Sequence, residues 1–310
     1  MKKVQFGKTG FQVSPLGFGA APIGYLNTER EKVRKILNLL LDRGVTIVDT
    51  AASYEGSEEM IAESIGHRRK DFVLISKCGG SLPDIDAPAW SAELIRKTVD
   101  RSLRRLRTDR LDVMLLHSCD LHTLQKGEAI GALVEAQKAG KVRFPGYSGD
   151  NEAAAWAAGR AEIGVIETSI NIADQVNIDT VLPKTRANDI GVLAKRPIAN
   201  AAWKPLSTQP GLYQGYAKTY TDRFAKMGLK IEDLGFKGKP EEIWAEIALR
   251  FTLSIEGVHS AIIGTTRPEN AERNIQYAEK GPLPVDVVKK IRFAFEKAQA
   301  SAGGGWTGQT

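Results

Sequence analysis

Four polar side chains stand at positions where proton transfer could take place. Asp49, Lys77 and His117 each end a short apolar run, and Tyr54 follows the first of these runs by five residues. A tyrosine, with a pKa of about 10, is a poor acid at neutral pH, but a nearby lysine ammonium favours its phenolate. An aspartate can pair with that lysine, and a neutral histidine can hold a carbonyl oxygen. Together they could protonate an oxygen that gains negative charge, as a carbonyl oxygen does when hydride adds to its carbon.

Each of these residues also has an ordinary structural interpretation. An aspartate after a strand often forms a turn or caps a helix. A lysine there is often only solvated, and an isolated histidine is often only hydrogen-bonded. The chemistry therefore depends on a fold that brings together four positions separated by nearly 70 residues.

The chain alternates strand-like and helix-like segments along most of its length. A hairpin and a first strand are expected within residues 1–19, where glycines surround short apolar pieces. Seven further strands are expected at 45–49, 71–77, 111–117, 141–148, 163–169, 190–196 and 259–264. Helices are expected at 29–41, 57–65, 91–106, 121–139, 151–158, 176–187, 240–254, 268–278 and 285–300.

Eight strands that alternate with helices indicate an α/β fold of the (β/α)8 TIM-barrel type. Short strands joined through helices pair in parallel by right-handed crossovers. The doubly wound alternative would need G-x-G-x-x-G after its first strand, and residues 17–24 lack that spacing. We expect one barrel domain over residues 1–310, with an N-terminal β-hairpin and a long irregular loop at 197–239, after strand seven. In a barrel the carboxyl ends of strands two, three and four lie side by side, so the four polar residues would meet at one mouth.

The composition narrows the class of protein. Apolar residues make up 42% of the chain and charged residues 26%, which is typical of a globular protein. No apolar run approaches the length of a membrane span, and the N-terminus lacks a signal-peptide core. Cys78 and Cys119 make no disulfide framework and, with the four histidines, no metal motif. We expect a cytoplasmic protein without a bound metal, and the formal charge of +6 indicates solvated helix faces rather than nucleic-acid binding.

Several motifs resemble those of the aldo-keto reductase family over nearly the whole chain. They are G-K-T-G-F-Q-V-S-P-L-G-F-G (7–19), V-D-T-A-A-S-Y-E-G-S-E-E (48–59), S-K-C-G (76–79), L-D-V-M-L-L-H (111–117) and I-I-G-T-T-R-P-E-N-A-E-R-N (262–274). The resemblance implies a catalytic tetrad of Asp49, Tyr54, Lys77 and His117. It also implies NADPH, or sometimes NADH, bound in an extended form across the barrel mouth.

The nicotinamide side departs from the family pattern. The family usually has Ser-Asn after strand five to hold the nicotinamide carboxamide, and here Gly149 follows Ser148. Strand six usually offers a Gln for the same amide, where this chain has Glu167. Asn171 matches a frequent Asn just beyond. The resemblance thus implies that Ser148 and Glu167 contact the nicotinamide, with a carboxylate at the place of the usual amide.

Two cations follow strand seven. Many family members place a nicotinamide-stacking Tyr there, and this chain has Lys195 and Arg196. Two cations suit a pyrophosphate. The alternative is a solvated loop.

The loop after strand eight is expected to bind the adenosine end of the cofactor. Many members clamp the 2′-phosphate there with a Lys and an Arg, whose places are taken here by Gly264 and Asn270. Arg267 and Arg273 lie nearby. With one cationic contact rather than two, we expect NADP(H) to be preferred moderately and NAD(H) to be possible. The cofactor-binding residues expected in this loop are Gly264, Thr265, Thr266, Arg267, Asn270 and Asn274.

Three functions compete. The first is an NAD(P)H-dependent reduction of a small aldehyde or ketone, with Tyr54 as proton donor. The second is a slow-turnover, cofactor-binding redox-sensing subunit on the same barrel, like relatives attached to channels. A chain that starts directly at its hairpin favours the free enzyme. The third, a dehydratase or metal-dependent hydrolase, lacks metal ligands.

Overall fold

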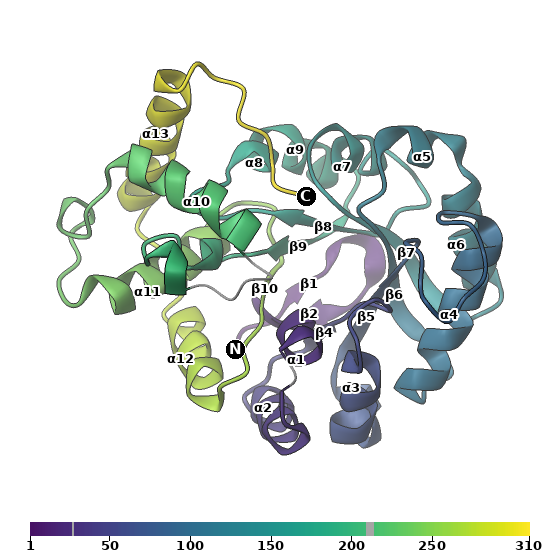
Figure 1. The fold of residues 1–310 in the computed structure, drawn as a ribbon. Coiled ribbons are helices and arrows are strands. Elements are labelled where there is room, and N and C mark those ends of the chain that lie inside the picture. Colours follow the sequence, from purple (N-terminus) through teal and green to yellow (C-terminus); the bar gives the residue numbers. More distant parts are fainter. Residues whose placement is uncertain (27, 209–213) are drawn as a thin grey trace.

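A closed barrel of eight parallel strands forms the centre of the computed structural model, which describes residues 1–26, 28–208 and 214–310 (Figure 1). Each strand pairs with the next along the chain, and β10 closes the ring against β3. This confirms the predicted (β/α)8 architecture. The barrel strands are β3 (Leu16–Gly19), β4 (Ile47–Asp49), β5 (Val73–Cys78), β6 (Leu111–His117), β7 (Val142–Ser148), β8 (Val165–Ser169), β9 (Gly191–Lys195) and β10 (Ser260–Ile263).

The predicted N-terminal hairpin is present. Strands β1 (Val4–Gln5) and β2 (Gln12–Val13) pair antiparallel, with the 3-10 turn η1 (Gly7–Thr9) between them. Phe6 and Val13 are fully buried and pack with the apolar side chains that fill the barrel, among them Ile75 and Leu115. The hairpin thus completes the barrel's interior core.

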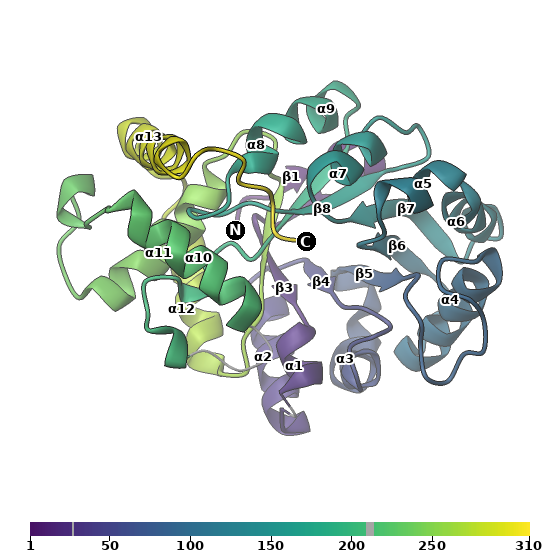
Figure 2. The ribbon, with the colours of Figure 1, turned by 45° about the horizontal axis from the view of Figure 1, so that its top comes forward.

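Helices surround the strands, as Figures 1 and 2 show from two directions. Their apolar faces pack on the outside of the barrel in a second, larger core. Ser91 caps its helix as predicted, because its hydroxyl accepts a hydrogen bond from the Leu94 amide at 3.1 Å. The helices are α1 (Ala21–Tyr25), α2 (Arg30–Asp42), α3 (Ser57–Ile65), α4 (Ala92–Leu106), α5 (Leu121–Lys126), α6 (Glu128–Lys138), α7 (Asn151–Ala157), α8 (Val176–Thr180), α9 (Leu182–Ala187), α10 (Gln214–Met227), α11 (Pro240–Leu253), α12 (Pro268–Glu279) and α13 (Val285–Ser301).

Two predicted helices are divided in the structure. The helix expected at 121–139 is α5 followed by α6, and the break falls at Gly127, which adopts the left-handed conformation. The helix expected at 176–187 is α8 followed by α9, with Pro183 in the first turn of α9. A proline is tolerated there because it has no amide hydrogen to donate, whereas it would interrupt a continuous helix.

The segment 197–239 is not the irregular loop that we expected. It contains α10, the 3-10 turns η3 (Ala199–Ala201), η4 (Leu206–Thr208) and η6 (Glu232–Leu234), and residues 209–213, which lie outside the described residues. Tyr220 of α10 is fully buried, and its hydroxyl donates to Asp174 at 3.1 Å. Only about one side chain per turn of α10 is buried. The apolar pattern in the sequence was therefore too weak to distinguish this helix from a polar loop.

Candidate active site

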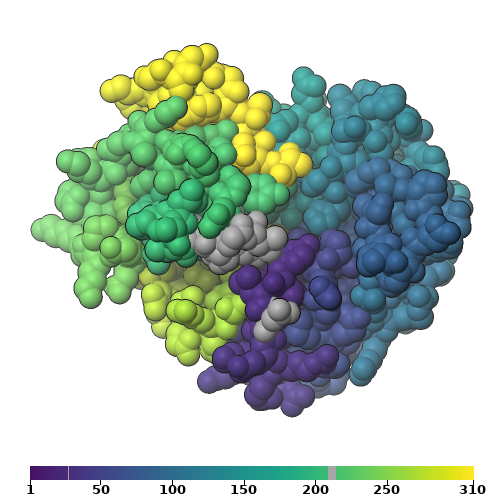
Figure 3. Space-filling model, in the orientation of Figure 1, coloured from purple at the N-terminus to yellow at the C-terminus, as the bar shows by residue number. Residues whose placement is uncertain are grey.

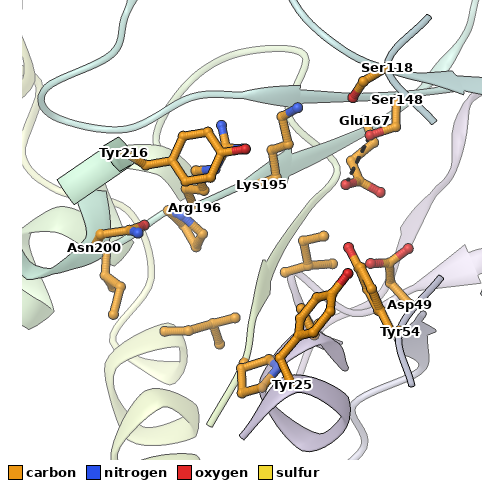
Figure 4. Close-up of a pocket in the computed structure, with 18 of the residues that line it drawn as sticks. Tyr25, Asp49, Tyr54, Ser118, Ser148, Glu167, Lys195, Arg196, Asn200 and Tyr216 are labelled. Carbon is orange, nitrogen blue, oxygen red and sulfur yellow. Dashed lines mark hydrogen bonds between the residues drawn. The ribbon is translucent and has the colours of Figure 1, made fainter. Parts of the chain in front are cut away.

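The carboxyl ends of the barrel strands surround a cavity of about 640 Å³. Asp49 ends β4, His117 ends β6, and Tyr54 follows β4 by one turn; all three line the cavity. Figure 4 shows Asp49 and Tyr54 side by side there. Lys77 in β5 lies beneath them and is almost fully buried. The structure therefore brings the four predicted catalytic residues together at one mouth.

Lys77 holds two buried carboxylates at the bottom of this cavity. Its ammonium lies 2.6 Å from both carboxylate oxygens of Asp49 and donates to the Thr50 carbonyl at 3.0 Å. Oε2 of Glu167, in β8, is 3.3 Å from the same nitrogen. Burial opposes the charge on Lys77, but Asp49 and Glu167 outweigh it and raise the pKa of Lys77. Lys77 is thus held in its charged form.

Tyr54 lies between aromatic and cationic neighbours. Its ring makes edge contacts with the rings of Tyr25 and His117, at centroid distances of 5.2 and 5.9 Å, and the Lys77 nitrogen is 5.5 Å from its centroid. Burial raises the pKa of Tyr54; Lys77 lowers it, as expected from the sequence, but by less than burial raises it. Tyr54 is therefore a protonated phenol at neutral pH, which suits a proton donor.

His117 is neutral. Burial, together with the nearby Lys77, lowers the pKa of His117 to about 3. A neutral imidazole carries one N–H, which can donate to a carbonyl oxygen in the cavity.

The nicotinamide-side residues stand level with this group. His117, Ser148 and Glu167 are register partners on β6, β7 and β8. The Ser148 hydroxyl donates to Oε1 of Glu167 at 3.2 Å. Gly149 has no room for the side chain that the family pattern would place there, because a Cβ would lie 2.3 Å from the Tyr147 hydroxyl oxygen. Asn171 is fully buried beyond β8 and does not line the cavity.

Lys195 and Arg196 both line the cavity but differ in their surroundings. Lys195 forms an ion pair with the buried Asp150 at 2.9 Å. Arg196 stacks on Tyr216 of α10, with its guanidinium carbon 3.9 Å from the ring centroid. Arg196 also donates to the Ser169 hydroxyl and the Gln309 carbonyl, but among the described residues it forms no ion pair with a carboxylate, so it is the better placed of the two to meet an anion.

The C-terminal segment 306–310 also reaches this mouth, which sequence reasoning missed. Figures 1 and 2 show it running back from α13 toward β8 and β9, and Figure 3 shows it in yellow between the green helices and the teal ones. The Gly308 amide donates to Asn151 and the Gln309 amide to Asp174, at 2.7 and 2.9 Å. Thr310 lines the cavity. The only sequence signal was Trp306, an aromatic residue after three glycines, which packs on Phe295.

The residues expected to bind the adenosine end separate into three groups. Gly264 and Thr265 follow β10, and Gly264 lines the main cavity, where a Cβ would lie 2.5 Å from the Gly19 carbonyl oxygen. A lysine could not replace it without a shift of the backbone. Thr266 and Arg267 line a second cavity of about 530 Å³. Asn270 and Asn274, on α12, line neither cavity.

The second cavity has cations that the sequence did not suggest. Lys32 and Lys35 of α2 line it together with Arg267. They lie more than 230 residues before Arg267 in the chain, so only the folded structure places them near it.

Within the described ranges, no cluster of three or more His, Cys, Asp or Glu residues could hold a metal ion. Cys78 and Cys119 are buried free thiols. None of the described helices is long and apolar enough to cross a membrane.

Comparisons with known proteins agree with this geometry. The model of the aldo/keto reductase family matches residues 15–295, and the chain therefore belongs to that family. It is an oxidoreductase of a family that acts on small carbonyl compounds.

Relatives with different names match the chain over most of their length. The chain is 27% identical to L-galactose dehydrogenase of Arabidopsis thaliana, over 87% of this chain and 85% of the relative. It is also 27% identical to a probable voltage-gated potassium channel subunit beta of the same plant, over 93% and 94%. The holo form of aldo-keto reductase AKR11C1 from Bacillus halodurans has a similar structure, with a TM-score of 0.79 and 25% identity over 95% and 96% of the two chains.

Proposed function

We propose that this chain, as a single barrel domain over residues 1–310, reduces aldehydes or ketones to alcohols with NADPH and that Tyr54 is the proton donor. The observation that carries the proposal is the position of Tyr54. It borders the 640 Å³ cavity between neutral His117 and the buried Lys77–Asp49 pair. A carbonyl oxygen placed between Tyr54 and His117 would receive two hydrogen bonds.

The residues present fit a nicotinamide dinucleotide. Oε2 of Glu167 is buried and accepts no hydrogen bond from the described residues, although Lys77 lies nearby. Ser148 and Glu167 would hold the nicotinamide end, and Arg196 a pyrophosphate. Thr266 and Arg267 would face a 2′-phosphate in the second cavity, which favours NADPH over NADH. We also propose that the segments around the remaining expected residues contact the cofactor, without a separate role for each side chain. These residues are Lys195, Gly264, Thr265, Asn270 and Asn274.

NADPH supplies the hydride when bound. Lys77 holds positive charge beneath Tyr54, and Asp49 holds Lys77 in place through two 2.6 Å contacts. His117 donates its single N–H to the substrate oxygen. Tyr54 gives its proton to that oxygen as negative charge develops on it and is left as a phenolate beside Lys77. In alcohol oxidation that phenolate would take the hydroxyl proton.

The test is to mix purified protein with NADPH and a panel of aldehydes and to follow the absorbance of the reduced nicotinamide. L-Galactose with NADP⁺ or NAD⁺ belongs in the panel because a relative bears the name of that substrate. We expect aldehyde-dependent oxidation of NADPH. Tight cofactor binding without turnover of any substrate would instead favour the redox-sensing subunit.

A further inference from the structure

Glu167 is a second carboxylate beside Lys77, which already pairs with Asp49. Glu167 is 4% exposed, and its side chain points into the main cavity toward Asp49 and Tyr54, as Figure 4 shows. Oε1 accepts from Ser148 at 3.2 Å, and Oε2 lies 3.3 Å from Lys77. Lys77 lies closer to Asp49, at 2.6 Å, so Glu167 is the less fully paired carboxylate.

Asp49 and Glu167 share one cation, Lys77, and His117 is neutral there. Burial and the nearby Glu167 raise the pKa of Asp49, against the opposing effect of Lys77, so the two carboxylates compete for that cation. Lys195 is not a second partner for them because it forms its closest ion pair with Asp150. A buried carboxylate without a full partner favours a cationic ligand.

Any nicotinamide that reacts at this site must come close to Glu167. Hydride transfer requires the ring to touch the carbon of a carbonyl whose oxygen lies between Tyr54 and His117. His117, Ser148 and Glu167 are level on three adjacent strands and line the same cavity, so Glu167 would be among the residues that hold such a ring. The oxidised ring carries a positive charge and the reduced ring carries none.

We propose that Glu167 makes this site bind the oxidised nicotinamide cofactor more tightly than the reduced one, an inference that rests on the proposed function. A carboxylate attracts the cationic ring, whereas an amide at this place would treat the two forms nearly alike. Glu167 therefore shifts the equilibrium on the enzyme toward the complex of oxidised cofactor and alcohol, which is the direction of carbonyl reduction. In that direction the hydride of the reduced cofactor would form a C–H bond at the carbonyl carbon, the carbonyl oxygen would take the Tyr54 proton, and alcohol and oxidised cofactor would form. In the reducing direction, Glu167 slows release of oxidised cofactor.

The experiment measures the dissociation constants of NADP⁺ and NADPH by titration calorimetry without substrate. The wild type is expected to bind NADP⁺ more tightly than NADPH. Glu167→Gln should weaken NADP⁺ binding about tenfold or more and change NADPH binding less than about threefold, because only the charge is removed. Glu58→Gln is the matched control: Glu58 is equally buried, on α3 and outside the cavity, and its removal should leave both constants unchanged.

Two results would overturn the inference. One is wild-type protein that binds NADPH more tightly than NADP⁺, a measurement that needs no variant. The other is a Glu167→Gln protein in which both constants shift equally or neither shifts. If the wild type binds neither cofactor, the proposed function falls together with the inference; if it binds both without this preference, only the inference falls.

Discussion

The ammonium of Lys77 lies 2.6 Å from both carboxylate oxygens of Asp49. Both side chains are almost completely buried, and Glu167 approaches the same ammonium from the opposite side of the barrel mouth at 3.3 Å. Breaking a buried pair by removing one partner is costly because it leaves the other charge without compensation. The centre of this site is therefore also a determinant of stability.

The two partners of this pair should differ in their effects. Lys77→Met leaves Asp49 and Glu167 buried together without a cation, and we expect it to lower the free energy of unfolding by about 3–5 kcal/mol. Asp49→Asn leaves Lys77 paired with Glu167 and should cost less. Lys77→Met should also reduce turnover and alter its pH profile, because Tyr54 loses its cationic neighbour. Urea unfolding and pH–rate profiles measure these effects.

Lys141→Met is the control for that comparison. Lys141 pairs with Asp100 at 2.5 Å, but both side chains are more than two-fifths exposed. An exposed pair contributes about 1 kcal/mol or less. An Asp49→Asn protein less stable than Lys77→Met, or an unaltered pH–rate profile in Lys77→Met, would contradict the account.

The neutral state of His117 predicts a specific pH dependence. Since its pKa lies at about 3, the imidazole does not titrate between pH 5 and 8. The kcat/KM for carbonyl reduction should show no inflection near the ordinary histidine pKa of about 6.5. An inflection there that disappears in His117→Gln would mean that the histidine is charged during turnover.

Arg267 is expected to distinguish NADPH from NADH. It lines the second cavity with Lys32 and Lys35, and a charge-assisted contact to phosphate contributes about 1.5–3 kcal/mol, or about ten- to a hundredfold in affinity. Arg267→Ala should lose NADPH affinity by that factor and keep NADH affinity. Arg273→Ala, which removes the same charge from α12 outside that cavity, should change neither. Equal losses for both cofactors, or none, would exclude Arg267 from the 2′-phosphate.

The segment 197–239 should become less accessible when cofactor binds. Asn200 and Tyr216 line the main cavity, and Tyr216 holds Arg196, the expected pyrophosphate ligand. We expect NADPH to slow tryptic cleavage within this segment severalfold, with cleavage sites elsewhere in the chain as the internal control. Mass spectrometry of the fragments locates the cuts. Equal cleavage rates within the segment with and without NADPH would show that cofactor binding does not protect it.

Local sequence patterns were enough to predict the barrel. They also predicted that four residues meet at its mouth: Asp49, Tyr54, Lys77 and His117. Apolar runs that end in polar residues are visible in the sequence, and parallel strand order then places their ends together. Three contacts could not be predicted from the sequence. They are the ion pair of Lys195 with Asp150, the position of Lys32 at the cavity that Arg267 lines, and the position of segment 306–310 at the barrel mouth. They join residues far apart in the chain, and no periodicity encodes them. The division of 121–139 at Gly127 was missed because one glycine only weakly opposes an otherwise continuous helical pattern.

The central claim is that Tyr54 protonates the carbonyl oxygen, and Tyr54→Phe tests it most directly. The phenylalanine keeps the ring contacts with Tyr25 and His117 and removes only the hydroxyl. We expect kcat for reduction of an aldehyde that the wild type accepts to fall about 10²- to 10⁴-fold, with the dissociation constant of NADPH nearly unchanged. A Tyr54→Phe enzyme that binds NADPH normally and turns over at a near-wild-type rate would contradict the account.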